Sequence, residues 1–206
     1  MDNKQKKIFM EIKPFSDVTK FHGHVCPGSA LGYQASRLGL KELSQGRSPD
    51  EEIIAVVEND SCAVDAIQVV TGCTFGKGNL IFFDFGKQAY TFASRDSGEA
   101  VRVSMKDSFD MNKLEPKLAE LRQKVSKGMA NPDDKVELGR LMKEVSQKVL
   151  EFPAEEIFDV NKVEITLPPK ASMYSSMKCS ECGEILSEHR SRLKNGKVVC
   201  IPCSED

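Results

Sequence analysis

The sequence predicts an α+β protein, with a mixed or antiparallel sheet, flanking helices and a small C-terminal zinc-finger module. Hydrophobic content of 40% and charged content of 29% over 206 residues are typical of a globular chain with a real core. Strand-like segments follow one another directly and also alternate with helical patterns, which favours α+β over a doubly wound sheet. Four of the seven cysteines lie within residues 179–206, which indicates a separate metal-binding tail.

The first half of the chain predicts most of the sheet. Pro27-Gly28 precedes an expected helix over 29–43, in which Leu31, Ala35 and Leu38 share one apolar stripe. A buried strand is expected over 51–59, followed by a helix over 62–71 that Asp60-Ser61 caps and Gly72 ends. Three further strands, joined by turns at 85–87 and 96–98, are expected over 80–85, 88–93 and 100–105.

The second half predicts helices before a last strand. Charged amphipathic patterns indicate helices over 114–127 and 133–150, then a short helix over 153–158 and a strand over 162–167. We therefore expect a core domain over 1–167, a linker over 168–178 and a finger over 179–206.

Charge and hydropathy exclude several classes of partner. A net charge of −2 and a pI near 6.0 give no electrostatic footprint for nucleic acid or anionic lipid. No apolar run approaches the roughly 18 residues that span a bilayer, and the N-terminus lacks the apolar core of a signal peptide. We expect a cytoplasmic protein without a membrane partner, whose odd number of cysteines act as metal ligands or reactive thiols.

The tail has the spacing of a structural zinc site. Cys179-x-x-Cys182 and Cys200-x-x-Cys203 can each form a knuckle, and together they supply four thiolates to one ion. Asn195-Gly196 predicts a hairpin turn between the pairs, in a treble-clef or zinc-ribbon-like module. A rubredoxin-like iron site or a redox dithiol pair are the alternatives.

The tail hairpin is basic. Its cations are Arg190, Arg192, Lys194 and Lys197. A solvated face explains them better than nucleic-acid or protein docking, which stays open as an alternative. His189 is expected to be a surface residue because four cysteines already complete the site.

His22, His24 and Cys26 are the most informative residues of the core. Imidazole and thiolate are transition-metal ligands and also the base and nucleophile of covalent catalysis. Pro27 favours an extended Cys26, and in a strand the three side chains share one face roughly 6–7 Å apart. Three ligands on a straight strand overreach one ion, so we expect two ligands here and a third from elsewhere.

Cys62 is the best third candidate. It lies at an expected helix start, where the helix dipole favours a thiolate, and its alternative role is that of a small buried residue. We expect a transition metal, zinc first, on His24, Cys26 and Cys62, with His22 or Asp60 as fourth ligand or acid–base group. Cys26, Cys62, Asp60 and His22 are thus the candidate catalytic residues. Cys73 either resolves an oxidised thiol or is a buried helix-end cysteine.

With these residues assembled, the chain resembles the FmdE-like family, which takes its name from formylmethanofuran dehydrogenase. The resemblance rests on four segments within roughly residues 15–105, and the four-cysteine tail is similar to an appendage of some members. The segments are Phe21–Gly28, Glu58–Gln68, Thr71–Leu80 and Asp84–Lys87.

The resemblance implies an intertwined homodimer with a metal or thiol site built from the His-x-Cys and Asp-Ser-Cys segments. It implies no settled reaction. The first hypothesis is a dimeric metalloprotein acting on an unknown small molecule through a metal-bound water or a polarised carbonyl. The alternatives are a non-catalytic metal-handling or molybdoenzyme-accessory protein that binds a partner enzyme, a thiol redox protein, and a docking module acting through the finger.

Overall fold

The computed structural model describes residues 12–205, and its contacts divide the chain between Pro169 and Lys170 into two compact units. Each unit is described by itself. None of the helices in the described range is long and apolar enough to cross a membrane.

The first unit is built on a mixed sheet of five strands in the order β2-β1-β3-β4-β5. The strands are β1 (Ile53–Val57), β2 (Leu80–Phe82), β3 (Ala89–Ser94), β4 (Ala100–Met105) and β5 (Phe158–Val163). All neighbours pair antiparallel except β1 and β2. The α+β prediction is confirmed. β2 and β3 follow one another along the chain as expected, but they do not pair, because β1 lies between them in the sheet.

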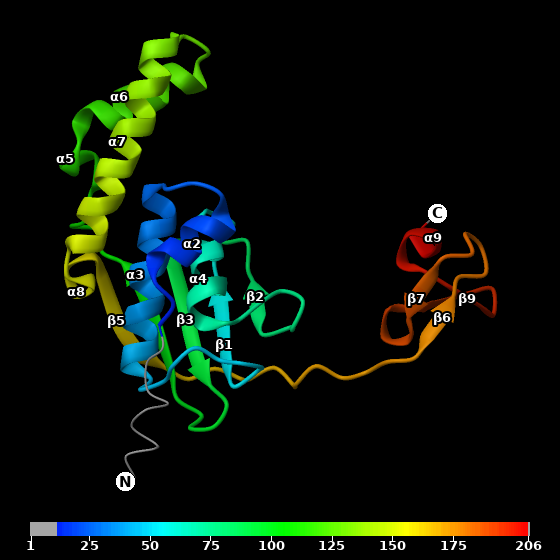
Figure 1. Cartoon of the computed structure of the whole chain (residues 1–206). Helices are drawn as coiled ribbons and strands as arrows, with labels where there is room; N and C mark the ends of the chain where they lie inside the picture. The colour runs from blue at the N-terminus through cyan, green and yellow to red at the C-terminus, as the bar shows by residue number, and fades with distance from the viewer. Residues whose placement is uncertain (1–11, 206) are drawn as a thin grey trace. The chain divides into compact units, whose positions relative to one another are not determined.

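Three helices cover one face of this sheet (Figure 1). They are α2 (Phe15–His22), α3 (Pro27–Glu42) and α4 (Ala63–Thr71). The main core between helices and sheet includes Leu40, Ile67 and Phe92, whose side chains are fully buried. The apolar stripe predicted for the first of the long helices is confirmed: Leu31, Ala35 and Leu38 of α3 are all buried.

Two glycines let α3 approach α4 closely. A Cβ atom built on Gly32 would lie 2.2 Å from the carbonyl oxygen of Ala63, and one on Gly28 would lie 3.2 Å from the Cβ of Cys62. Gly28 and Gly32 are four residues apart, so they share one face of the helix. This face brings the start of α4, and with it Cys62, against the start of α3.

Gly32→Ala should therefore destabilise the first unit by about 1–3 kcal/mol, because the backbone of Ala63 cannot yield to the added methyl group. Urea unfolding of the variant measures the loss. Gly139→Ala is the matched control, since Gly139 lies in a helix and has no atom within 4 Å of a built Cβ. That control should gain about 0.5–1 kcal/mol, and an equal loss in both variants contradicts the close-packing role of Gly32.

The second half of the unit adds four helices before β5. They are α5 (Met111–Leu114), α6 (Pro116–Ser126), α7 (Pro132–Glu151) and α8 (Ala154–Ile157). The single helix expected over 114–127 is wrong at its start, because Pro116 forces Glu115 into an extended conformation and separates α5 from α6. The last strand begins at Phe158, earlier than expected, and ends at Val163 because its partner β4 begins at Ala100.

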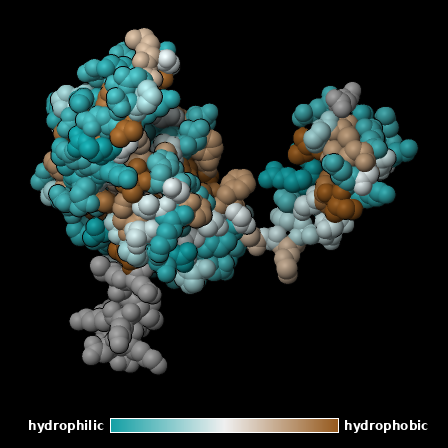
Figure 2. Space-filling view, turned by 45° about the horizontal axis from the view of Figure 1, so that its top comes forward, coloured by the Kyte–Doolittle hydropathy of each residue, from teal (hydrophilic) through white to brown (hydrophobic). Residues whose placement is uncertain are grey.

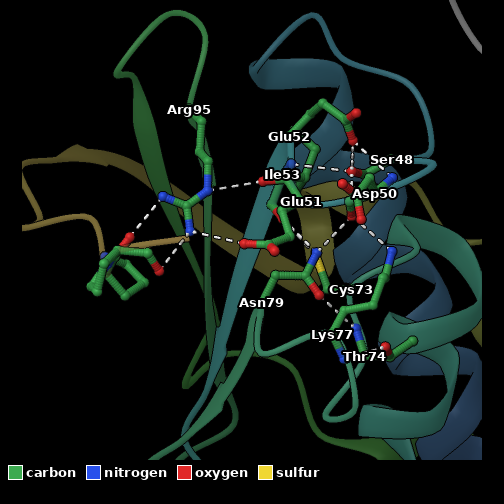
Figure 3. A network of polar contacts seen from close by, with 12 residues as sticks. Ser48, Asp50, Glu51, Glu52, Ile53, Cys73, Thr74, Lys77, Asn79 and Arg95 are labelled. Atoms are coloured by element: carbon green, nitrogen blue, oxygen red, sulfur yellow. Dashed lines mark hydrogen bonds and ion pairs between the residues drawn. The ribbon is translucent and has the colours of Figure 1, made fainter. Parts of the chain in front are cut away.

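The segment after β5 continues along the other face of the sheet. Ile165 and Leu167 pack there against a small cluster of Ile54, Ala93 and Ala100. Arg95, labelled in Figure 3, then holds the end of the unit, since its guanidinium donates to the carbonyl oxygen of Pro168 at 2.7 Å.

The second unit contains two hairpins and a terminal helix. Its elements are β6 (Ser176–Lys178), β7 (Ile185–Ser187), the 3-10 helix η1 (Glu188–Arg190), β8 (Arg192–Lys194), β9 (Lys197–Val199) and α9 (Ile201–Glu205). β6 lies within the segment 168–178 that the sequence predicts as a linker, and it pairs with β7. The turn between β8 and β9 has positive φ at Asn195 and Gly196, so the predicted turn is confirmed.

Candidate metal centre

Four potential ligands converge at the start of α3 and α4. One ligand atom from each of His22, His24, Cys26 and Cys62 lies within 4.8 Å of all the others. We call this group the core cluster. Cys26 is buried, His22 and Cys62 are half-buried, and His24 is exposed. The structure thus brings Cys62 together with the histidines and Cys26, which are distant from it in sequence.

A helix end, not an extended strand, gathers the first three residues. His22 is the last residue of α2, and Gly23 ends that helix with a φ of 87°. The chain reverses there, and Cys26 becomes the N-cap of α3. The expectation of an extended segment is wrong, because the left-handed turn at Gly23 places the Nε2 of His22 3.6 Å from the Sγ of Cys26.

His22 is oriented by an acidic residue that the sequence pattern did not single out. Its Nδ1 lies 2.7 Å from a carboxylate oxygen of Asp65, which leaves Nε2 facing the core cluster. Burial lowers the pKa of His22, but hydrogen bonds to Asp65 and Cys26 outweigh burial and raise the pKa overall. Asp65 follows Cys62 by three residues on α4, so helical spacing was the available signal.

The start of α3 favours a thiolate at Cys26. The backbone N–H of Ser29 donates to the Sγ of Cys26 at 3.4 Å, in the position of an N-cap acceptor. Burial raises the pKa of Cys26, yet hydrogen bonds from Ser29, Cys62 and His22 lower it overall. Cys26 is therefore the readily ionised thiol of the cluster.

The pKa of Cys62 is shifted in the opposite direction from that of Cys26. Burial and the neighbouring charge of Cys26 raise the pKa of Cys62 above its ordinary value. The helix begins one residue later than predicted, at Ala63, and its N-cap is Cys62 instead of Asp60-Ser61. The raised pKa of Cys62 also runs against the expected thiolate at this position. A cation placed between the two sulfurs would remove their mutual repulsion and allow both to ionise.

Two other candidates lie outside the core cluster. Asp60 is exposed, and its carboxylate is not among the grouped ligand atoms; it lines a cavity beside Cys62. Cys73 is fully buried at the far end of α4, where its thiol donates to the carbonyl oxygen of Ile53 at 3.3 Å. Burial raises the pKa of Cys73 to about 11, as for a structural thiol.

The second unit holds the other cluster. The Sγ atoms of Cys179, Cys182, Cys200 and Cys203 lie within 4.8 Å of one another. Backbone N–H groups of Cys182 and Cys200 lower the pKa of Cys179 to about 6, which favours the thiolate that binds zinc. The second pair brackets the start of α9, so knuckle, hairpin and helix follow in the order of a treble clef. His189 stands apart, stacked on Tyr174 with ring centroids 4.0 Å apart.

Comparisons with known proteins give a family match for each of the two units. Residues 21–159 match the family described as FmdE, Molybdenum formylmethanofuran dehydrogenase operon, and residues 173–206 match the Prokaryotic dksA/traR C4-type zinc finger. A solved structure from Syntrophus aciditrophicus, described as a tungsten formylmethanofuran dehydrogenase FmdE-like protein, is 25% identical with a TM-score of 0.59. The match covers 95% of this chain and 97% of the solved chain.

A curated relative from Archaeoglobus fulgidus is named "Probable S-adenosyl-L-methionine-binding protein". It is 34% identical over 95% of this chain, and the chain spans 56% of its length. The zinc-finger match and the four clustered cysteines identify the second unit as a metal-binding module. Because the FmdE match extends over most of the first unit and more than half of the chain, the chain belongs to the FmdE family and carries a C4-type zinc finger at its C-terminal end.

Proposed function

We propose that the core cluster binds a transition metal, with zinc the best match, beside a cavity that admits a small molecule. The convergence of His22, His24, Cys26 and Cys62 within 4.8 Å carries this proposal. Two imidazoles and two thiolates are a common zinc ligand set. The contact between His22 and Asp65 supports it further, because a metal-bound histidine usually donates its other N–H to a carboxylate.

The four ligands differ in how firmly the fold holds them. Cys26 is fixed as an N-cap, Cys62 by the close packing of α3 on α4, and His22 by Asp65. His24 is exposed and lies against the ring of His22, with centroids 4.3 Å apart. We therefore assign His22, Cys26 and Cys62 as the permanent ligands and His24 as the displaceable one. A metal bound there supplies a Lewis acid to a molecule in the cavity.

Cobalt titration tests the proposal. Metal-free chain should take up two equivalents of Co²⁺ with thiolate–cobalt absorption, one for each cluster. Cys26→Ser should take up one equivalent, and Cys73→Ser should still take up two because Cys73 belongs to neither cluster. If the parent chain is saturated after one equivalent of Co²⁺ and Cys26→Ser gives the same spectrum, the proposal is contradicted.

Asp65→Asn should weaken metal binding at the core cluster by about 10–100-fold, because His22 loses the carboxylate that orients it and increases its basicity. Competition with a chromophoric chelator measures the affinity, and the finger serves as the internal reference. Asp60→Asn should leave the affinity unchanged, since Asp60 is not among the clustered ligands. A weaker site in Asp60→Asn alone contradicts the assignment.

A thiol redox centre is the second candidate, favoured by the contact between a readily ionised Cys26 and the Cys62 thiol. Oxidation by two electrons would join the two sulfurs and release their protons, with a disulfide such as oxidised glutathione as the oxidant. Mass spectrometry of the zinc-loaded chain separates the two functions. A Cys26–Cys62 disulfide formed under mild oxidant while metal is present favours the redox centre.

We also propose that the chain forms the homodimer that the family resemblance implies. Exposed phenylalanines support an apolar contact surface, and Figure 2 shows hydrophobic residues exposed among hydrophilic ones. Phe83 and Phe85 are exposed and stack on each other with centroids 5.5 Å apart. Light scattering over a range of protein concentrations tests this, and a monomer at all of them contradicts it.

A further inference from the structure

A cavity of about 440 Å³ opens beside the core cluster. His22 and Cys62 line it on the side of the cluster, while Phe75 and Phe82 belong to the loop before β2 and to β2 itself. Most of the lining is apolar, and the volume suits a small organic molecule. The cavity is thus placed so that a bound molecule contacts both the cluster and the phenylalanine rings.

Apart from His22, the charged side chains that line the cavity are all acidic. Asp60 and Asp65 both line the cavity, and no lysine or arginine within residues 12–205 does so. Asp65 is engaged with His22, whereas the Asp60 carboxylate has neither a hydrogen bond nor an ion pair with any residue of that range. An anion would therefore meet uncompensated negative charge, and a cation would meet a free carboxylate.

The loop that carries Phe75 is held in place although its phenyl ring is 82% exposed. Asn79 is fully buried, accepts from the N–H of Thr74 at 2.9 Å and donates to the carbonyl oxygen of Ile53 at 2.9 Å. Lys77 donates to the carbonyl oxygen of Asp50 at 2.7 Å from the same loop (Figure 3). The loop backbone that carries Phe75 is therefore held in place before any ligand binds, which lowers the cost of ordering this side of the cavity.

We propose that this cavity binds a small organic cation with a flat apolar body. Aromatic faces attract organic cations, and a carboxylate at the rim complements the same charge. The inference rests on the proposed function only in placing the ligand beside a metal; binding itself needs the phenylalanines and Asp60. The ligand class is thus an ammonium or related cation, not a phosphate or carboxylate.

Saturation-transfer NMR titrations with three probes test the proposal. Benzyltrimethylammonium is a permanent cation that cannot coordinate metal, benzyl alcohol is neutral, and benzenesulfonate is an anion. The cation should bind most tightly and the sulfonate should show no saturation transfer. Asp60→Asn should lower the affinity for the cation by about fivefold, because one solvent-exposed charge contact is lost.

Two neighbouring phenylalanines give a matched pair of variants. Phe82 and Phe83 are both 47% exposed, but only Phe82 lines the cavity. Phe82→Ala should weaken cation binding by about tenfold through the lost ring contact, and Phe83→Ala should leave it within about twofold. Asp96→Asn, in an exposed turn, is the control for Asp60→Asn.

Binding of the sulfonate as tight as that of the cation would overturn the inference, as would cation binding unchanged in both Asp60→Asn and Phe82→Ala. Metal analysis of the same samples keeps the two proposals apart. A preference for the cation together with metal only in the finger would contradict the core metal site and support the cation-binding cavity. Metal in both clusters without a preference for the cation would support the core metal site and contradict the cation-binding cavity.

Discussion

Cys62→Ser is expected to retain one zinc ion per chain where the parent chain retains two. Cys62 supplies one of two sulfurs in the core cluster and is the member that lies at the start of α4. Serine at this position offers a hydroxyl, which is a poor zinc ligand at neutral pH. The remaining ligands belong to the turn between α2 and α3, so the ion would lose its link to α4. Elemental analysis of purified protein gives the ratio.

The control for this variant is Cys73→Ser, at the other end of the same helix. Cys73 is fully buried, and its thiol donates to the backbone of Ile53 away from the core cluster, so its replacement should leave two ions bound. Comparing the two variants separates loss of a ligand from general damage to α4. Loss of zinc from Cys73→Ser with retention in Cys62→Ser would contradict the assignment.

Removing zinc from the finger should unfold the second unit and leave the first unit folded. Within residues 170–205 only Cys179 and Val199 are buried, so this unit has almost no apolar core. Zinc binding by such modules is worth about 10–16 kcal/mol at neutral pH, which makes the metal their main source of folding free energy. The first unit has an extensive core of its own.

NMR spectra of Cys182→Ser measure this effect. Resonances of residues 170–205 should lose their dispersion, and those of the five-stranded sheet should keep theirs. His189→Ala should change little, because His189 stacks on Tyr174 and belongs to neither group of ligands. A second unit that stays folded in Cys182→Ser would show that the cysteines do not hold a structural metal.

The finger could be predicted from the sequence because its ligands come in local pairs. Each Cys-x-x-Cys closes a short loop, and Asn195-Gly196 fixes the hairpin between them. For the core cluster, the sequence predicted which residues come together but not the backbone conformation that brings them together. A period of two predicts an extended segment for His22, His24 and Cys26, whereas Gly23 in a left-handed conformation makes a sharp turn between two helices.

The residues that complete the core cluster depend on tertiary packing. Gly28 and Gly32 bring α4 close enough for Cys62 to join, and their role becomes visible only when the partner helix is known. Asp65 reaches His22 across the same contact. Hydrophobic runs located the first four strands, whereas the last strand begins earlier than expected. The parallel pairing of β1 with β2 did not follow from the sequence, because strand order depends on the path of the intervening helix α4.

Diffraction data collected at the zinc absorption edge test the core metal site most directly. We expect two anomalous peaks per chain, one among the finger cysteines and one between His22, Cys26 and Cys62, with Asp65 on the far side of the His22 ring. A single peak at the finger, with Cys26 and Cys62 joined by a disulfide or left as free thiols in zinc-supplemented crystals, would contradict the proposal.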